Sequence, residues 1–263
     1  MRAYLSVFSA RFCMLLQYRA AVVTDIAAEV FSGLIQVMIF AAFFAASDTP
    51  QPMTYAGVVT YVWVRQALLS LIAVTLDGDI HSLVRSGNIT YELLRPLDLY
   101  TLWYTRSLAQ RLAPALLHLV PVFGFAALFF DLGPPPTWAG ALAWVASTLC
   151  ALLLAAAVSC LLSISLLWTI SGSGMEFLVI GVISVLSGAV VPLPFFPEWV
   201  QPILQALPFR GLVDLPIRLY TGHIPPAEAL PVLAHQLGWV AALVLLGRWI
   251  FSRGTRRIVI QGG

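Results

Sequence analysis

The chain alternates between long apolar runs and short polar interruptions, at the scale of a lipid bilayer. A transmembrane helix needs about 20 apolar residues, and six runs reach or approach that length. We therefore predict an all-α membrane protein with six transmembrane helices, an N-terminal interfacial helix, a cytoplasmic coupling helix and an outer re-entrant hairpin. The predicted spans are residues 20–46, 54–76, 113–130, 138–167, 175–191 and 230–251.

Two segments outside these spans have patterns of their own. Residues 1–19 place aromatic and aliphatic side chains on one helical face and polar ones on the other. Such a short, two-faced helix is expected to lie in the membrane interface. Residues 192–226 are interrupted by prolines, which exclude a straight span. We predict an outer hairpin of two short helices there, with its broken backbone covered by protein. The whole chain, residues 1–263, forms one predicted transmembrane domain.

The stretch from Leu76 to Pro114 is the longest part of the chain that is not dominated by apolar residues. Asp79 is the expected N-cap of a short helix that ends before Gly87. Pro96 interrupts the chain, and a second helix is expected from Leu99 towards Pro114. We interpret this region, residues 77–112, as a docking surface. The alternative is a solvated loop without a role.

Composition agrees with the apolar pattern. Of 263 residues, 60% are hydrophobic and 10% are charged, whereas a soluble domain carries about 25% charged residues. All 14 basic residues are arginine. Eleven of them lie in the N-terminal segment, the 76–114 stretch and the C-terminal tail, and only Arg210 and Arg218 lie on the opposite side. The positive-inside rule then places both termini and the polar stretch in the cytoplasm.

Several kinds of chemistry are not predicted. A P-loop requires a lysine, and the chain has none, so the sequence predicts no ATPase site of its own. The three cysteines, Cys13, Cys150 and Cys160, lack metal-ligand spacing. We expect no catalytic residue, no metal and no cofactor bound by this chain. A net charge of +2 gives no indication of nucleic-acid binding.

Four polar residues interrupt the first two spans. Asp25, Glu29 and Gln36 share one face of the first predicted span, and Arg65 lies near the middle of the second. Charged side chains in a bilayer are expected to face the bundle interior or a wet cavity. Depths counted from the helix ends make Glu29–Arg65 the candidate ion pair, as a structural staple or with a role in transport. His118, in the third span, is interpreted as a packed histidine with no evident partner.

Small residues form a row in the fifth predicted span. Such a row lets two helix backbones approach closely, which favours a subunit seam, although packing within the chain is a nearly equal alternative. The residues of this row are Gly174, Gly181, Ser184 and Gly188.

Three stretches resemble the permease subunits of ABC-2-type (type V) exporters, in particular a six-span bacterial subfamily. The first runs from Arg85 to Ile89 and continues from Tyr91 to Tyr100. The second combines Pro192 to Trp199 with Leu207 to Arg210. The third is the tail, with Arg256-Arg257, Val259 and Gln261-Gly262-Gly263.

This resemblance implies a transmembrane permease subunit of an ATP-driven exporter in the bacterial inner membrane. Two copies of a separate ABC ATPase, which bind ATP and Mg, would work with two permeases, as a homodimer or a heterodimer. The helix after the second span would insert into a cleft of the ATPase. The coupling residues implied are Asp77, Asp79, Ile80, Leu83, Arg85, Gly87, Tyr91, Glu92, Leu93, Leu94, Arg95 and Pro96.

Two alternatives from other classes remain open from the residues alone. The first is an ion-coupled carrier that uses the Glu29–Arg65 pair, although the two halves of the chain show no inverted repeat. The second is a membrane-embedded enzyme that uses Asp25, Glu29 or His118. An exporter should co-purify with an ATPase, whereas these alternatives should not.

Overall fold

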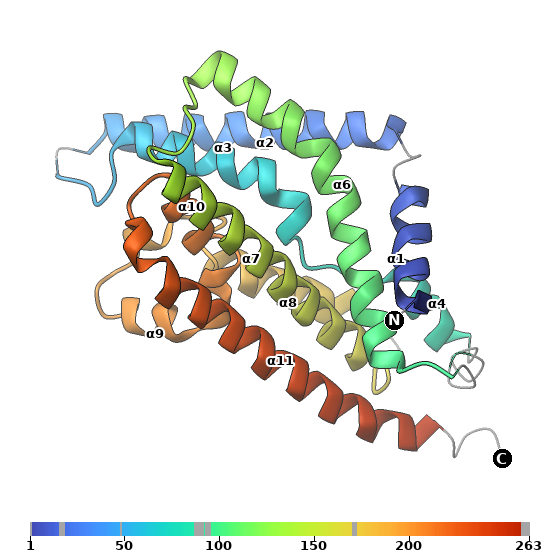
Figure 1. The fold of residues 1–263 in the computed structure, drawn as a ribbon. Coiled ribbons are helices and arrows are strands. Elements are labelled where there is room, and N and C mark those ends of the chain that lie inside the picture. Colours follow the sequence, from blue (N-terminus) through green and yellow to red (C-terminus); the bar gives the residue numbers. More distant parts are fainter. Residues whose placement is uncertain are drawn as a thin grey trace.

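The computed structural model describes residues 2–15, 19–47, 49–86, 92, 96–169 and 173–258. Within these residues all regular structure is helical, as predicted, and the longer helices pack side by side in a bundle (Figure 1). Among the expected coupling residues, Gly87, Tyr91, Leu93, Leu94 and Arg95 lie outside the described residues. The helices are α1 (Arg2–Leu15), α2 (Arg19–Ala45), α3 (Tyr55–Ile72), α4 (Gly78–Arg85), α6 (Leu99–Phe130), α7 (Trp138–Ser165), α8 (Ser173–Leu186), η1 (Leu193–Phe195), α9 (Gln201–Ala206), η2 (Pro208–Gly211), α10 (Asp214–Tyr220), η3 (Pro226–Glu228) and α11 (Ala229–Ile258).

Among the described residues, five helices are long and apolar enough to cross a membrane, namely α2, α3, α6, α7 and α11. They correspond to five of the six predicted spans. The remaining one, residues 175–191, contains only the 14-residue helix α8 and the turn after it. At about 1.5 Å per residue, α8 is shorter than the hydrocarbon core of a bilayer. The count of six spans therefore stays a prediction.

The largest difference from the predicted elements is α6. The sequence suggested a cytoplasmic helix from Leu99 and a separate span from residue 113, but the structure has one helix of 32 residues, Leu99–Phe130, with Pro114 and Pro121 inside it. A proline breaks the helical hydrogen-bond ladder at one position, and neighbouring helices can support the freed carbonyl group. The polar residues from Leu99 onward are thus part of the same helix as a membrane-spanning segment.

Helix α3 lies at the centre of the bundle and contacts α2, α6, α7 and α10. Its side chains are buried over most of its length, and Trp63 lies with its ring 5.2 Å from that of Phe125 and 4.9 Å from that of Phe130. Two aromatic rings of α6 therefore pack against one tryptophan of α3 and hold the two helices together. α3 ends at Ile72, four residues before the predicted end at Leu76.

The segment from 192 to 226 contains the two predicted short helices, α9 and α10, with the 3₁₀ turn η1 before α9 and the 3₁₀ turn η2 between the two helices. Gln236 of α11 holds this segment against the bundle. Its Nε2 donates to the carbonyl oxygens of Gly211, at 2.7 Å, and Ser147, at 3.1 Å, while its Oε1 accepts from Ser147 Oγ at 3.0 Å. Fully buried, Gln236 therefore connects α11, α7 and η2. Sequence reasoning did not identify it.

Candidate functional site: a polar joint around α4

Helix α4 begins with a capped turn. Asp77, rather than the predicted Asp79, is the N-cap, and its carboxylate accepts from the backbone N–H groups of Asp79, at 2.9 Å, and Ile80, at 3.3 Å. The chain before it is extended, because α3 has already ended at Ile72. Asp77 can therefore adopt the non-helical backbone that an N-cap requires. Asp79 is freed for side-chain contacts within the first turn.

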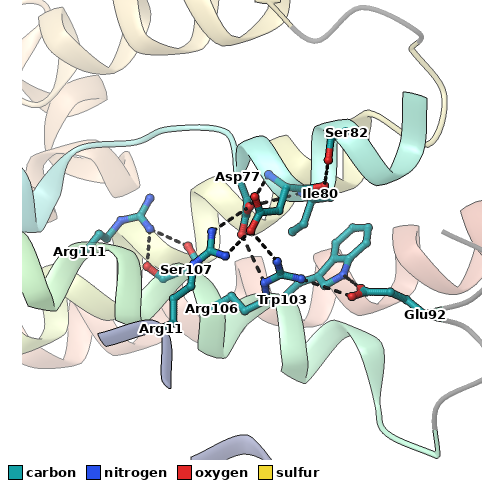
Figure 2. A network of polar contacts seen from close by, with 10 residues as sticks. Arg11, Asp77, Ile80, Ser82, Glu92, Trp103, Arg106, Ser107 and Arg111 are labelled. Atoms are coloured by element: carbon teal, nitrogen blue, oxygen red, sulfur yellow. Dashed lines mark hydrogen bonds and ion pairs between the residues drawn. The ribbon is translucent and has the colours of Figure 1, made fainter. Parts of the chain in front are cut away.

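Two arginines from other helices converge on the start of α4 (Figure 2). Arg106 of α6 lies 3.6 Å from the Asp77 carboxylate, 3.1 Å from that of Asp79 and 3.5 Å from that of Glu92. Arg11 of α1 pairs with Asp79 and lies 3.5 Å from Asp77. One guanidinium thus joins three acidic side chains, which suits its planar set of five N–H donors. We call Arg11, Asp77, Asp79, Glu92 and Arg106 the polar joint.

Burial makes the members of the polar joint more dependent on one another than those of an ordinary surface ion-pair cluster. The side chains of Asp77 and Glu92 are 4% and 9% exposed, and that of Arg106 is 12% exposed. Carboxylates withdrawn from water to this extent must be compensated by charge and hydrogen bonds. Trp103 Nε1 also donates to Glu92 Oε2, at 3.4 Å. The polar joint therefore fixes α4 to α1 and α6.

Asp79 differs from the buried carboxylates Asp77 and Glu92, because its own side chain is 54% exposed. Its hydrogen bond with Arg11, together with the charges of Arg11 and Arg106, holds the pKa of the Asp79 carboxyl below its usual value. A carboxyl with a lowered pKa in the folded state contributes its stability above its unfolded pKa, and loses it only as the pH falls through the folded pKa. The Asp79 contacts are therefore complete at neutral pH.

Some of the expected coupling residues are buried and anchor α4 to its own chain, while others are exposed. Ile80 is 1% exposed and packs with Leu99, Tyr100 and Trp103, so it faces its own chain, as do Asp77 and Glu92. The exposed residues of α4 and its C-terminal cap include Asp79, Ser82, Arg85 and Ser86, while Leu83 is half-buried and Pro96 is exposed. Among the coupling residues that the structure describes, only Asp79, Leu83, Arg85 and Pro96 are therefore at least partly open to another protein.

The extended segment between α3 and α4 is also fastened. The backbone N–H of Thr75 donates to Ser159 Oγ of α7 at 3.1 Å, and that of Leu76 donates to Glu176 Oε1 of α8 at 2.9 Å. Arg111 of α6 binds the same serine hydroxyl. Sequence reasoning assigned no such role to Ser159 or Glu176, because nothing in the local pattern links residues about 84 or 100 positions apart. A displacement of α4 would thus reach α7 and α8 as well.

The predicted Glu29–Arg65 ion pair is replaced by two other contacts. Arg65 Nη2 donates to Gln36 Oε1 at 3.0 Å, and Glu29 Oε1 lies 2.9 Å from His118 Nδ1. The prediction assumed that the inner ends of the two spans, the start of the first and the end of the second, lie at one depth. Glu29 lies ten residues into α2, yet its partner Ser70 lies two residues before the end of α3, so α2 extends about two turns further inward.

His118 is therefore not a histidine without a partner. It is 4% exposed, and its Nδ1 lies within hydrogen-bond distance of both Glu29 Oε1 and Ser70 Oγ, the latter at 2.8 Å. Glu29 is 8% exposed, whereas Asp25, one turn earlier, is exposed. The cluster of Glu29, Ser70 and His118 joins α2, α3 and α6 inside the bundle.

The row of small residues in and after α8 is split. Gly174 and Gly181 are exposed, and a methyl group at either would meet nothing within 4 Å. Ser184 donates to the carbonyl of Ile180. Gly188 lies beyond the end of α8 in a turn with φ +86°, buried against Tyr61, so it packs within the chain instead of forming part of a seam. The heptad spacing did not reveal that the helix ends before it.

In the part of the chain that the structure describes, several long apolar helices around buried polar contacts define a multi-pass helical membrane protein. A family model described as ABC-2 family transporter protein matches residues 26–262. The chain therefore belongs to the ABC-2 transporter family, as its motifs had suggested, and is a membrane transport subunit of the permease type. Membership implies association with an ABC ATPase. Among curated proteins, no match was found.

Proposed function

We propose that this chain is the transmembrane permease subunit of an ATP-driven exporter, with α4 as the lever that a separate ATPase moves. The observation that carries this proposal is the polar joint, in which Arg106 and Arg11 tie α4 to α6 and α1. Because α6 is one continuous helix, a push on α4 acts directly on a membrane-spanning element. The bonds of Thr75 and Leu76 carry the same push to α7 and α8.

The orientation and energy source complete this proposal. The eleven arginines on the side of the termini support a cytoplasmic position for both termini and for α4. ATP and Mg would be bound by the partner ATPase, in two copies, since this chain has no lysine for a P-loop. The resemblance to bacterial exporters supports export across the inner membrane. The alternative of an ion-coupled carrier relied on an ion pair between Glu29 and Arg65. It loses its main support, because Arg65 bonds to Gln36 and Glu29 contacts His118.

The docking assignment is tested by reversing one exposed charge on α4. Arg85→Glu should reduce co-purification of the ATPase at least about tenfold, since repulsion at a docking surface costs on the order of 1.4 kcal/mol or more. Its side chain is exposed, so thermal stability should stay unchanged. The matched control is Arg253→Glu, an exposed arginine of α11 that stacks on Trp249. Full ATPase recovery with Arg85→Glu would contradict the assignment.

The second permease is expected to pack on α8. This helix exposes Phe177, at 80%, and Leu178, at 65%, beside the open glycines Gly174 and Gly181. An apolar face on a membrane helix is not by itself an interface, because lipid can cover it, but small residues allow close helix packing. We propose that α8 contributes to the seam between two permeases, which are either identical or different chains.

Cross-linking tests this seam. In a background without the three native cysteines, Gly181→Cys should form a disulfide between permease subunits when two copies of this chain are present, since close packing brings the two helices within bonding distance. The control is Leu128→Cys on α6, which is 81% exposed on another helix and should not cross-link. Assemblies with two copies in which Gly181→Cys stays monomeric on oxidation would exclude a homodimeric seam at α8.

A further inference from the structure

A small polar cavity lies at the end of the bundle remote from α4, between α9, η2 and α10 on one side and η3 and α11 on the other (Figure 1). Its wall carries Arg210, Arg218 and Glu228 beside apolar residues such as Leu215 and Val232. Its volume of about 290 Å³ is below the range of about 300–1,000 Å³ that is usual for drug-sized ligands. The cavity therefore suits a charged headgroup better than a whole amphiphile.

The two arginines keep N–H donors that the protein does not use. Arg210 is half-buried and makes no hydrogen bond or ion pair within the described part of the chain. Among its guanidinium nitrogens only Nε is fully buried without a partner, which leaves the two Nη groups accessible. Arg218 Nη1 lies 3.7 Å from Asp214 Oδ2, too far for a hydrogen bond, and the Arg218 side chain is 32% exposed.

The charges of the two arginines act on each other. Burial lowers the pKa of Arg210, the charge of Asp214 partly restores it, and the charge of Arg218 lowers it again. The two guanidinium groups are thus close enough to repel each other. An anion that contacts both would be stabilised by both charges and by charge-assisted hydrogen bonds.

An acidic side chain on the same wall limits which anion fits. Glu228 of η3 is exposed, and no ion pair joins it to either arginine among the described residues. A simple anion would satisfy the arginines but would be repelled by Glu228. A ligand that joins an anion to a cation through a short linker complements all three side chains. His235 also lines the cavity, but its ring nitrogens are buried, so we assign it no contact with the ligand.

The surroundings of the cavity indicate the depth of lipid headgroups. The candidate span that includes α11, Pro226–Thr255, is about 45 Å long at about 1.5 Å per residue, which exceeds the hydrocarbon core of about 30 Å. Trp199, just before α9, is 77% exposed, and Trp138, at the start of α7, is 89% exposed. Gly140 places the start of α7 beside Leu219 and Pro226, close to the cavity. Exposed tryptophans are typical of the membrane–water interface.

We propose that this cavity binds the headgroup of a phospholipid that carries a primary ammonium group. Arg210 and Arg218 donate to the phosphate oxygens, because guanidinium groups match the geometry of phosphate. Glu228 accepts from the ammonium group, which has three N–H donors. The bound headgroup joins η2 and α10 to the start of α11. This inference does not depend on the export function proposed above.

Native mass spectrometry of the full-length protein in a neutral detergent tests the site, with dioleoyl phosphatidylethanolamine as the added lipid. We expect one lipid per chain to bind more tightly than any further lipid. Arg210→Gln should weaken this first binding at least about tenfold, because charge-assisted hydrogen bonds to phosphate are lost. The matched control is Arg253→Gln, an exposed arginine near the other end of α11, which should bind as the wild type does. Equal binding by these two variants would overturn the inference.

A second measurement uses the wild type and so does not depend on the folding of a variant. Dioleoyl phosphatidylglycerol has the same chains and phosphate but no ammonium group, so it should bind about two- to fivefold more weakly, as expected for the loss of an exposed ion pair. Glu228→Gln should abolish this difference. Equal or tighter binding of phosphatidylglycerol by the wild type would overturn the inference. Displacement of the lipid by an equal concentration of inorganic phosphate would also overturn it, because the cavity would then be a site for a free anion.

Discussion

Replacing Arg106 with alanine should cause both unfolding at lower temperature and loss of coupling to the ATPase. The variant leaves the carboxylates of Asp77 and Glu92 buried without their common partner, and removing one member of a buried ion pair costs about 3–5 kcal/mol. Asp79 adds little to this expectation, because its side chain is 54% exposed. Thermal unfolding in detergent measures the first effect, and ATP hydrolysis by the assembled complex measures the second.

Two controls separate the polar joint from general effects of losing an arginine. Arg248→Ala removes an exposed ion pair, in which the side chain of Arg248 is 52% exposed and that of Asp98 is 46% exposed. It should therefore change the free energy of unfolding by only about 0–1 kcal/mol. Arg106→Lys keeps the charge but loses the planar fork that reaches three carboxylates, and should fall between wild type and alanine. Equal stability of Arg106→Ala and Arg248→Ala would contradict the structural role of the polar joint.

The apolar pattern of the sequence was sufficient to predict most of the long helices. Arg19–Ala45 and Trp138–Ser165 correspond closely to predicted spans, because a helix in lipid must be long, apolar and internally hydrogen-bonded. Ala229–Ile258 starts as predicted but continues seven residues beyond the predicted end of its span at Phe251. The same reasoning missed the continuity of α6. Its two prolines suggest a break in the helix, whereas the structure has one helix that contains both of them. Proline is tolerated in membrane helices because neighbouring groups can satisfy the freed backbone.

The polar contacts were less predictable, because they depend on how helices are offset and rotated against each other. The candidate pair Glu29–Arg65 came from depths counted along each helix, and the real offset of α2 brings Glu29 level with Ser70 instead. The polar joint combines Arg11 with Asp77 and Arg106, from three separate elements. Sequence shows that such charges exist in a mainly apolar chain, but pairing them requires the tertiary structure.

Alanine at Gly188 should produce the other large effect. This glycine follows α8 with φ +86°, a backbone conformation that costs a residue with a Cβ about 1–2 kcal/mol. The added carbon would also lie 2.6 Å from Tyr61 Oη and 3.2 Å from Leu193 Cγ. Because Tyr61 is 1% exposed and cannot move into solvent, overpacking adds about 1–3 kcal/mol. We therefore expect a loss of about 2–5 kcal/mol in chemical denaturation.

The two parts of that cost can be separated by a second substitution. Tyr61→Phe removes the hydroxyl oxygen that the new carbon would meet, so the Tyr61→Phe, Gly188→Ala double variant should recover the packing part and retain the backbone part. Gly181→Ala is the matched control on α8, because nothing lies within 4 Å of its added carbon and alanine favours a helix by about 1 kcal/mol over glycine. Equal stability of Gly188→Ala and Gly181→Ala would contradict the prediction. It would mean that the turn after α8 does not pack Gly188 against Tyr61.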